Sequence, residues 1–97
     1  MSLVFLVSLA ARNDAVKVQR HLESQQAGLA ERFQKDLADC WASIIAHPRG
    51  YQVRYRRFRY APLAVFKYQV IYSVGRKAVV IHRVRHAHQR PLKRYAG

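Results

Sequence analysis

The spacing of apolar residues changes along the chain, and in the first half it predicts a strand followed by helices. Residues 3–7 are continuously apolar and rich in β-branched and aromatic side chains, which is typical of a strand inside a sheet. Apolar residues then recur at helical spacing from Ala15 to Leu22. Asn13 and Asp14 offer capping side chains just before them, so we expect a short helix to begin there.

A second helix is predicted from a longer apolar stripe with i, i+3, i+4 spacing and charged residues elsewhere. The stripe consists of Leu29, Ala30, Phe33, Leu37, Cys40, Trp41, Ile44 and Ile45. Pro48 disfavours helical geometry at His47, and Gly50 permits a turn, so the helix should end at His47. Because a chain of this size has few other large groups to bury, the stripe is expected to cover a sheet.

Beyond Gly50 the apolar period changes to two, which indicates strands. Alternation runs through residues 51–56, resumes in residues 65–74 and returns in residues 78–86, with a tight turn expected at Gly75. These segments predict a three-stranded antiparallel meander.

Strict alternation has consequences for which side chains share a face. In the last strand it places His82, Val84 and His86 on one face and Arg83 and Arg85 on the other. In the central strand it turns apolar residues toward the helical stripe and leaves the opposite face of the sheet open for arginines.

The element order indicates an α+β two-layer fold, with an N-terminal strand, a helical hairpin and the meander, in one domain covering residues 1–97. Hydrophobic residues make up 51% of the chain, which argues against disorder. The single cysteine, Cys40, forbids an internal disulfide and is interpreted as a buried residue in a cytoplasmic protein. The apolar run at residues 3–11 lacks preceding positive residues and is too short to span a bilayer, so neither a signal peptide nor a membrane association is expected.

Charge is distributed unevenly between the two halves. Of 18 Lys and Arg residues, 13 lie in residues 49–97, which contain no Asp or Glu, whereas residues 1–48 hold five basic and five acidic residues. A uniformly cationic half usually serves an anionic partner. Nucleic acid, or an acidic protein that masks the same surface, is the expected class.

Familiar catalytic and metal motifs are absent from the sequence. It contains no Gly-rich phosphate loop, no CxxC and no HExxH, and the basic half offers no carboxylate. His82, His86 and His88 stand at alternate positions, but the arginines between them disfavour a bound cation, so no metal and no cofactor are expected.

Two functions remain open for the basic half on the residues alone. RNA cleavage by 2′-hydroxyl attack needs a base, an acid and positive groups, and His86 or His88 could act as the base. Alternatively, the basic residues only bind phosphates or an acidic partner. Aromatic residues interleaved with arginines favour nucleic-acid binding through stacking. The interleaved residues are Tyr51, Tyr55, Phe58 and Tyr60 among Arg54, Arg56, Arg57 and Arg59.

The central and last strands resemble those of a known family. Residues 66–72 (Phe-Lys-Tyr-Gln-Val-Ile-Tyr), residues 79–86 and the closing His86-x-x-x-Arg90-Pro91 are similar to the toxins of RelE/ParE-type bacterial toxin–antitoxin systems, although Lys67 stands where a proline is usual. The resemblance implies a cytoplasmic toxin that inhibits growth, stabilises plasmids and is held inactive by a cognate antitoxin, acidic and partly disordered.

The target that the resemblance implies is either DNA gyrase, poisoned by binding, or ribosome-bound mRNA, cleaved by a metal-independent endoribonuclease. A non-toxic nucleic-acid-binding module is the alternative. The cleaving branch has an arginine where this chain has Gln69, and the ending is closer to the ParE-like branch. Residues expected in the acid–base step are His86, His88 and Tyr95. Residues expected to bind nucleic acid or the target are Arg54, Arg56, Arg83, Arg85 and Arg90.

Overall fold

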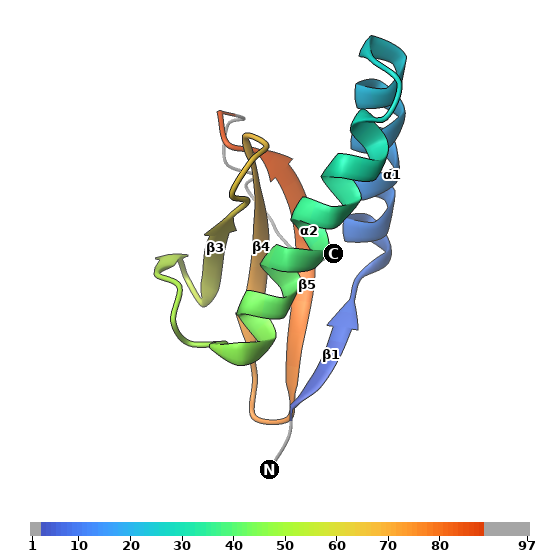
Figure 1. Ribbon diagram of the computed structural model, residues 1–97. Coiled ribbons are helices and arrows are strands. Elements are labelled where there is room, and N and C mark those ends of the chain that lie inside the picture. Colours follow the sequence, from blue (N-terminus) through green and yellow to red (C-terminus); the bar gives the residue numbers. More distant parts are fainter. Residues whose placement is uncertain (1–2, 89–97) are drawn as a thin grey trace.

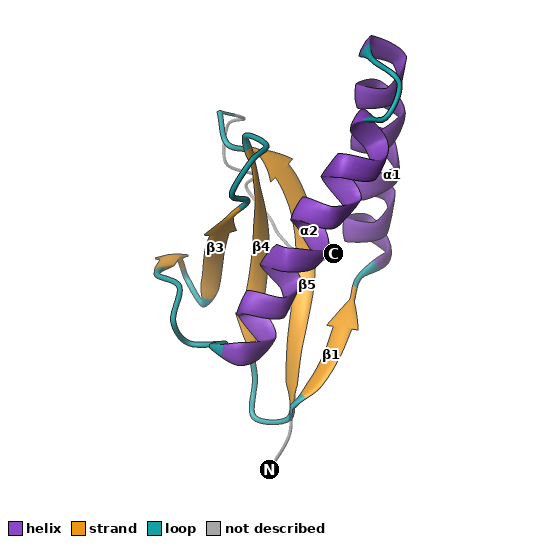
Figure 2. Cartoon of the chain, viewed as in Figure 1, coloured by secondary structure: helices purple, strands orange, loops and turns teal. Residues whose placement is uncertain are grey.

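The structure, a computed structural model, describes residues 3–88 (Figure 1). In chain order its elements are β1 (Val4–Val7), α1 (Leu9–Gln25), α2 (Leu29–Ala46), β2 (Val53–Tyr55), β3 (Phe58–Pro62), β4 (Tyr68–Val74) and β5 (Ala78–His86). The two helices form a hairpin on one face of a five-stranded sheet (Figure 2), which confirms the expected two-layer α+β fold. None of the helices within residues 3–88 is long and apolar enough to cross a membrane.

The strand order is β1-β5-β4-β3-β2, with β1 parallel to β5 and every other pair antiparallel. The meander therefore has four strands rather than the predicted three. The difference arises after the first predicted strand, where a turn at Arg56 and Arg57 leads into β3, a strand that the sequence did not predict. The predicted turn at Gly75 is present, and the Gly75 N–H donates to the Ala78 carbonyl at 2.8 Å.

The first helix begins earlier than the sequence predicts. Ser8, not Asn13 or Asp14, is its N-cap, and the Ser8 hydroxyl accepts a hydrogen bond from the Ala11 N–H at 3.0 Å. The same hydroxyl donates to the His82 carbonyl of β5 at 2.9 Å. Ser8 therefore ends β1, starts α1 and fixes both to the sheet, and the N-cap expected at Asn13 and Asp14 is wrong.

The hairpin between the helices is closed by a carboxylate. Glu23, near the end of α1, accepts hydrogen bonds from the N–H groups of Gly28 and Ala30 at 3.1 to 3.2 Å. These bonds lower the pKa of Glu23 from its ordinary value. Gly28 has a φ of 92°, which only glycine adopts without strain. The second helix then runs to Ala46 and is capped by His47, as predicted.

The main core lies between α2 and the sheet. Phe33 and Ile44 of α2 are fully buried together with Val70 and Tyr72 of β4. The ring of Phe33 meets that of Tyr68 edge to face, with centroids 5.6 Å apart. The predicted packing of the helical stripe against the central strand is confirmed.

The alternation predicted for β5 is interrupted at His82. Consecutive residues of β4, Ile71 and Tyr72, pair with Arg83 and Ile81, so His82 is one extra residue in β5. Such a bulge reverses the facing of every later side chain. Val79 and Ile81 face the helices before the bulge, and Val84 faces them after it. The prediction that His82 and Val84 share a face is therefore wrong.

Candidate functional site

At the edge of the sheet away from β1, two strands form a hairpin in which arginines cover aromatic rings. This hairpin, called the arginine hairpin below, consists of β2, β3 and the turn between them, residues 53–62. The guanidinium carbon of Arg54 lies 5.3 Å from the centroid of Tyr60, that of Arg56 lies 5.4 Å from Tyr55, and that of Arg57 lies 5.1 Å from Phe58, which are cation–π distances.

The rings under these arginines form a second, smaller apolar cluster. Phe58 and Ile71 are buried, and Tyr55 and Tyr60 pack against them. The rings of Tyr55 and Phe58 are stacked, with centroids 6.4 Å apart and an interplanar angle of 10°. This cluster joins the open-face side chains of the hairpin to Ile71 of the neighbouring strand β4. The tyrosines remain half-buried, so the hairpin offers ring edges as well as positive charge.

The turn of the arginine hairpin adopts an unusual backbone conformation. Arg56 has a φ of 52°, the single positive value at a non-glycine residue among residues 3–88. An arginine in this region of conformational space is strained by about 1 kcal/mol or more relative to glycine. Strain of this kind is common where a side chain must be presented to a partner.

Beside the hairpin lies a buried polar pair that the sequence analysis did not single out. The Nε2 atom of His82 lies 2.7 Å from the hydroxyl of Ser73, and the His82 ring meets Phe58 edge to face at 5.0 Å. Burial, and then the nearby Arg57, lower the pKa of His82. His82 is thus a neutral, satisfied group of the open-face cluster at neutral pH.

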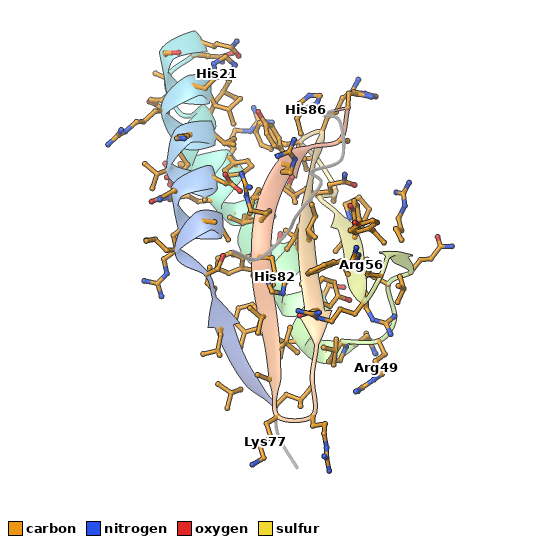
Figure 3. All side chains as sticks on the ribbon, turned by 180° about the vertical axis from the view of Figure 1, so that it is seen from behind. His21, Arg49, Arg56, Lys77, His82 and His86 are labelled. Carbon is orange, nitrogen blue, oxygen red and sulfur yellow. The ribbon has the colours of Figure 1, made fainter. Side chains whose placement is uncertain are left out.

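The loop before the hairpin presents one further arginine, Arg49. Arg59 of β3 anchors this loop, because its Nη1 donates to the carbonyl of Tyr51 at 2.6 Å and to that of Arg49 at 3.2 Å. The Tyr72 hydroxyl donates to the Pro48 carbonyl at 2.7 Å. Arg49 is therefore exposed on an anchored loop, on the same side of the molecule as Arg56 (Figure 3). It was missing from the predicted binding residues, although it begins the basic run.

The two predicted arginines of β5 lie on the open face by register. Arg85 pairs with Gln69 and Arg83 with Ile71. The guanidinium of Arg83 turns around the edge of the sheet to Asp14 of α1, with Nε at 2.6 Å and Nη2 at 3.0 Å from the two carboxylate oxygens. Arg83 thus helps to attach the helical hairpin to the sheet.

His86 and His88 lie apart from the arginine hairpin. The register pairs His86 with Tyr68, on the helix-facing side, and their rings meet at 5.1 Å. The His88 ring lies 5.3 Å from His86, and the His88 N–H donates to His86 Nδ1 at 3.1 Å. The structure does not bring these histidines together with Arg54 or Arg56.

The remaining predicted site residues, Arg90 and Tyr95, lie outside the described residues. Within residues 3–88, no group of three His, Cys, Asp or Glu side chains is arranged to hold a metal ion. The described part of the open face combines arginines, half-buried tyrosines and a neutral histidine. Such a surface suits binding of an anionic macromolecule, because it offers positive charge and stacking.

The chain is similar to known proteins in both sequence and fold. Residues 5–91 match the family model of the ParE toxin of type II toxin-antitoxin system, parDE. A chain of the solved chromosomal ParDE TA system from P. aeruginosa has the same fold, with a TM-score of 0.78 and 14% sequence identity, over 87% of this chain and 95% of that chain. A comparison with curated proteins finds no match.

Proposed function

This chain belongs to the ParE toxin family of type II toxin–antitoxin systems, and we propose that it poisons DNA gyrase by binding through the arginine hairpin. Membership in the family supports the toxin role and an antitoxin as partner, as the sequence resemblance predicted. The choice of gyrase, the surface used and a cytoplasmic site of action are the proposal.

The observation that carries the proposal is the construction of the arginine hairpin. Arg54, Arg56 and Arg57 each lie over an aromatic ring, and residues 49–97 contain no acidic side chain. Guanidinium groups that already lie against rings lose less conformational entropy on binding than free side chains do. This lowers the entropy cost of binding an anionic surface through the hairpin.

Binding is favoured over RNA cleavage by the positions of the candidate proton-transfer groups. Gln69 on the open face has an amide, which neither accepts nor releases a proton at neutral pH. His82 is buried against Ser73, and His86 pairs with Tyr68 on the opposite face. A cleavage mechanism needs a base within hydrogen-bond reach of the 2′-hydroxyl while arginines hold the phosphate. The described residues of the open face offer no such exposed base.

The antitoxin is proposed to be acidic and partly disordered in its free state. Its segment would cover the cationic half, residues 49–97, where 13 basic residues occur without an Asp or Glu in the same stretch. Folding on binding lets such a segment cover a wide surface, and opposite charge speeds the encounter.

The test begins with induction of the gene in bacteria, alone and together with the gene of the neighbouring small protein. Induction alone should arrest growth, and co-expression should restore it. Purified protein should then inhibit supercoiling by gyrase while mRNA in a ribosome-dependent assay stays intact. A triple variant with Arg54, Arg56 and Arg57 changed to Gln should lose inhibition. A control with the exposed residues Arg12, Arg20 and Lys77 changed to Gln should retain it.

Other outcomes would replace the proposal with a specific alternative. Cleavage of mRNA within codons on the ribosome, with normal supercoiling, would assign the chain to the RelE-like mechanism. Harmless induction combined with salt-dependent binding of nucleic acid would indicate a non-toxic binding module.

A further inference from the structure

A pocket of about 300 Å³ opens between α1 and the ends of β4 and β5, away from the arginine hairpin. One wall comes from a single face of α1 and the other from the helix-facing side of the sheet. Its lining residues are Asp14, Lys17, Val18, His21, Tyr68, Val84 and His86. His21 and His86 lie at the same end of the molecule, whereas Lys77 lies at the opposite end and Arg56 at the other edge of the sheet (Figure 3).

The charge in this pocket is not balanced by its one carboxylate. Both oxygens of Asp14 are bound to Arg83, and one of them also accepts the Val84 N–H at 3.0 Å. Lys17 follows Asp14 by one turn of α1, and within residues 3–88 it has no hydrogen-bond or ion-pair partner. His21 stands a further turn along the same face. The pocket is therefore a cationic recess whose internal anion is already paired.

The rest of the pocket offers rings and apolar side chains. Tyr68 and His86 stand edge to face on the sheet wall, and the side chains of Val18 and Val84 form a buried floor. Its volume lies at the lower end of the range of small-molecule sites, which mix apolar walls with a few polar groups that fix the ligand. A mononucleotide is of this size.

From this arrangement we propose that the pocket binds a phosphate monoester of mononucleotide size, with Lys17 and His21 on the phosphate and His86 and Tyr68 beside the sugar or base. At neutral pH a phosphate monoester carries about −1.5 to −2 charges and three acceptor oxygens, so it can accept hydrogen bonds from both Lys17 and the His21 ring. The phosphate is carried either by a free nucleotide or by the 5′ end of a nucleic-acid strand. The proposal does not depend on the arginine hairpin or on gyrase.

The binding is tested by calorimetry on the purified full chain at an ionic strength of about 0.1 M, where the Debye length is about 10 Å. The probes are inorganic phosphate and a nucleoside monophosphate. We expect saturable binding of the monophosphate, tighter than that of inorganic phosphate. Lys17→Gln and His21→Gln should each weaken it about tenfold, as expected for loss of one charge-assisted hydrogen bond. Both residues are exposed, so the variants should fold normally, which circular dichroism checks.

The matched control is Lys77→Gln, which removes the same charge from the β4–β5 turn. It should change the affinity by less than about twofold, because charges beyond a Debye length are screened. Equal weakening by Lys17→Gln and Lys77→Gln would overturn the proposal, since it would show binding to the net charge of +13 and not to the pocket. Absence of saturable binding by the unmodified chain would also overturn it.

Two oligonucleotides of one sequence, with and without a 5′ phosphate, distinguish the sources of the phosphate. A preference for the phosphorylated strand that is lost in Lys17→Gln would identify a strand end as the ligand. Equal binding of both strands, with the monophosphate still bound, would identify a free nucleotide. Because neither readout involves growth or gyrase, failure here is distinguishable from failure of the proposed function.

Discussion

The carboxylate of Asp14 forms a bidentate ion pair with the guanidinium of Arg83, 69 positions later in the sequence. The Nε–Oδ2 distance is 2.6 Å and the Nη2–Oδ1 distance is 3.0 Å. The same carboxylate accepts the N–H of Val84. The parallel strand β1 ends at Val7, opposite Ile81, so beyond that point no other strand of residues 3–88 pairs with this edge of β5. At this edge Asp14 accepts the hydrogen bond of the Val84 N–H, a backbone donor that would otherwise be unpaired in a half-buried position.

Replacing Asp14 with Asn should therefore destabilise the fold. Asn keeps one acceptor but loses the charge, so the Arg83 side chain, which is only 26% exposed, loses its ion pair with the Asp14 carboxylate. We expect the free energy of unfolding to fall by about 1–3 kcal/mol, as when one partner of a partly buried charged hydrogen bond is removed. Urea titration followed by circular dichroism measures the loss.

The control for this variant is Asp39→Asn. Asp39 bonds Lys35 one turn earlier on α2, and the two side chains are 67% and 80% exposed. Exposed pairs of this kind contribute about 0.3–0.5 kcal/mol, so little change is expected. Similar losses in both variants would mean that the Asp14 contact is no more than another surface pair.

The Asp14–Arg83 contact marks a limit of sequence analysis. The fold followed from periods of 3.6 and 2, because these periods record which faces are buried. Asp14, by contrast, was predicted as a helix cap and Arg83 as a target contact. A capping side chain acts on its own neighbours in sequence, and the N-cap is Ser8, which lies five residues before Asn13 and whose hydroxyl also bonds β5. A long-range ion pair leaves no comparable periodic signal.

The bulge at His82 could have been found from the sequence. Val79 and Ile81 are two residues apart, but the next apolar residue, Val84, follows after three, and such a slip indicates an inserted residue. The pocket residues Lys17 and His21 could not have been found in this way, because polar side chains on a helix usually face solvent. Only the position of α1 beside β5 brings them to His86.

His82 should make stability depend on pH. Its pKa is lowered in the folded chain by burial and by Arg57, so the unfolded chain binds the proton more readily. The stabilisation is complete above the unfolded pKa of about 6.5 and is lost as the pH falls from there to the lowered folded value. We expect His82→Gln to remove a slope of up to about 1.4 kcal/mol per pH unit in this window. Urea titrations between pH 5 and pH 8 would measure it.

The exposed His47 provides the comparison for His82. His47→Gln removes an imidazole that is exposed at the end of α2, so it controls for the loss of a histidine as such. If His82→Gln and the unmodified chain lost stability in parallel below about pH 6.5, protonation of His82 would not be the cause of the pH-dependent loss of stability.

Cys40 should be unreactive in the folded protein. Burial, and then the Asp36 carboxylate, raise its pKa to about 11, and its thiol points at the Ala61 carbonyl, 3.7 Å away. At pH 8 about one thiol in a thousand is then ionised, and the thiolate is the reactive form. Modification by a disulfide reagent should be slower than in denaturant by on the order of 100-fold or more. Rapid modification of the native chain would contradict this burial.

Arg56 offers a test that separates stability from function. At its φ of 52° a glycine is relaxed, so Arg56→Gly should leave the free energy of unfolding within about 1 kcal/mol of the unmodified value, although the contact with Tyr55 is lost. Arg57→Gly removes the same charge where φ is not positive, and it uncovers Phe58, so it should destabilise by about 1 kcal/mol.

Under the proposed function, both variants should need about tenfold more protein to inhibit gyrase, because each removes one contact charge. An Arg56→Gly variant that is both stable and fully inhibitory would show that the strained arginine is not retained for target binding.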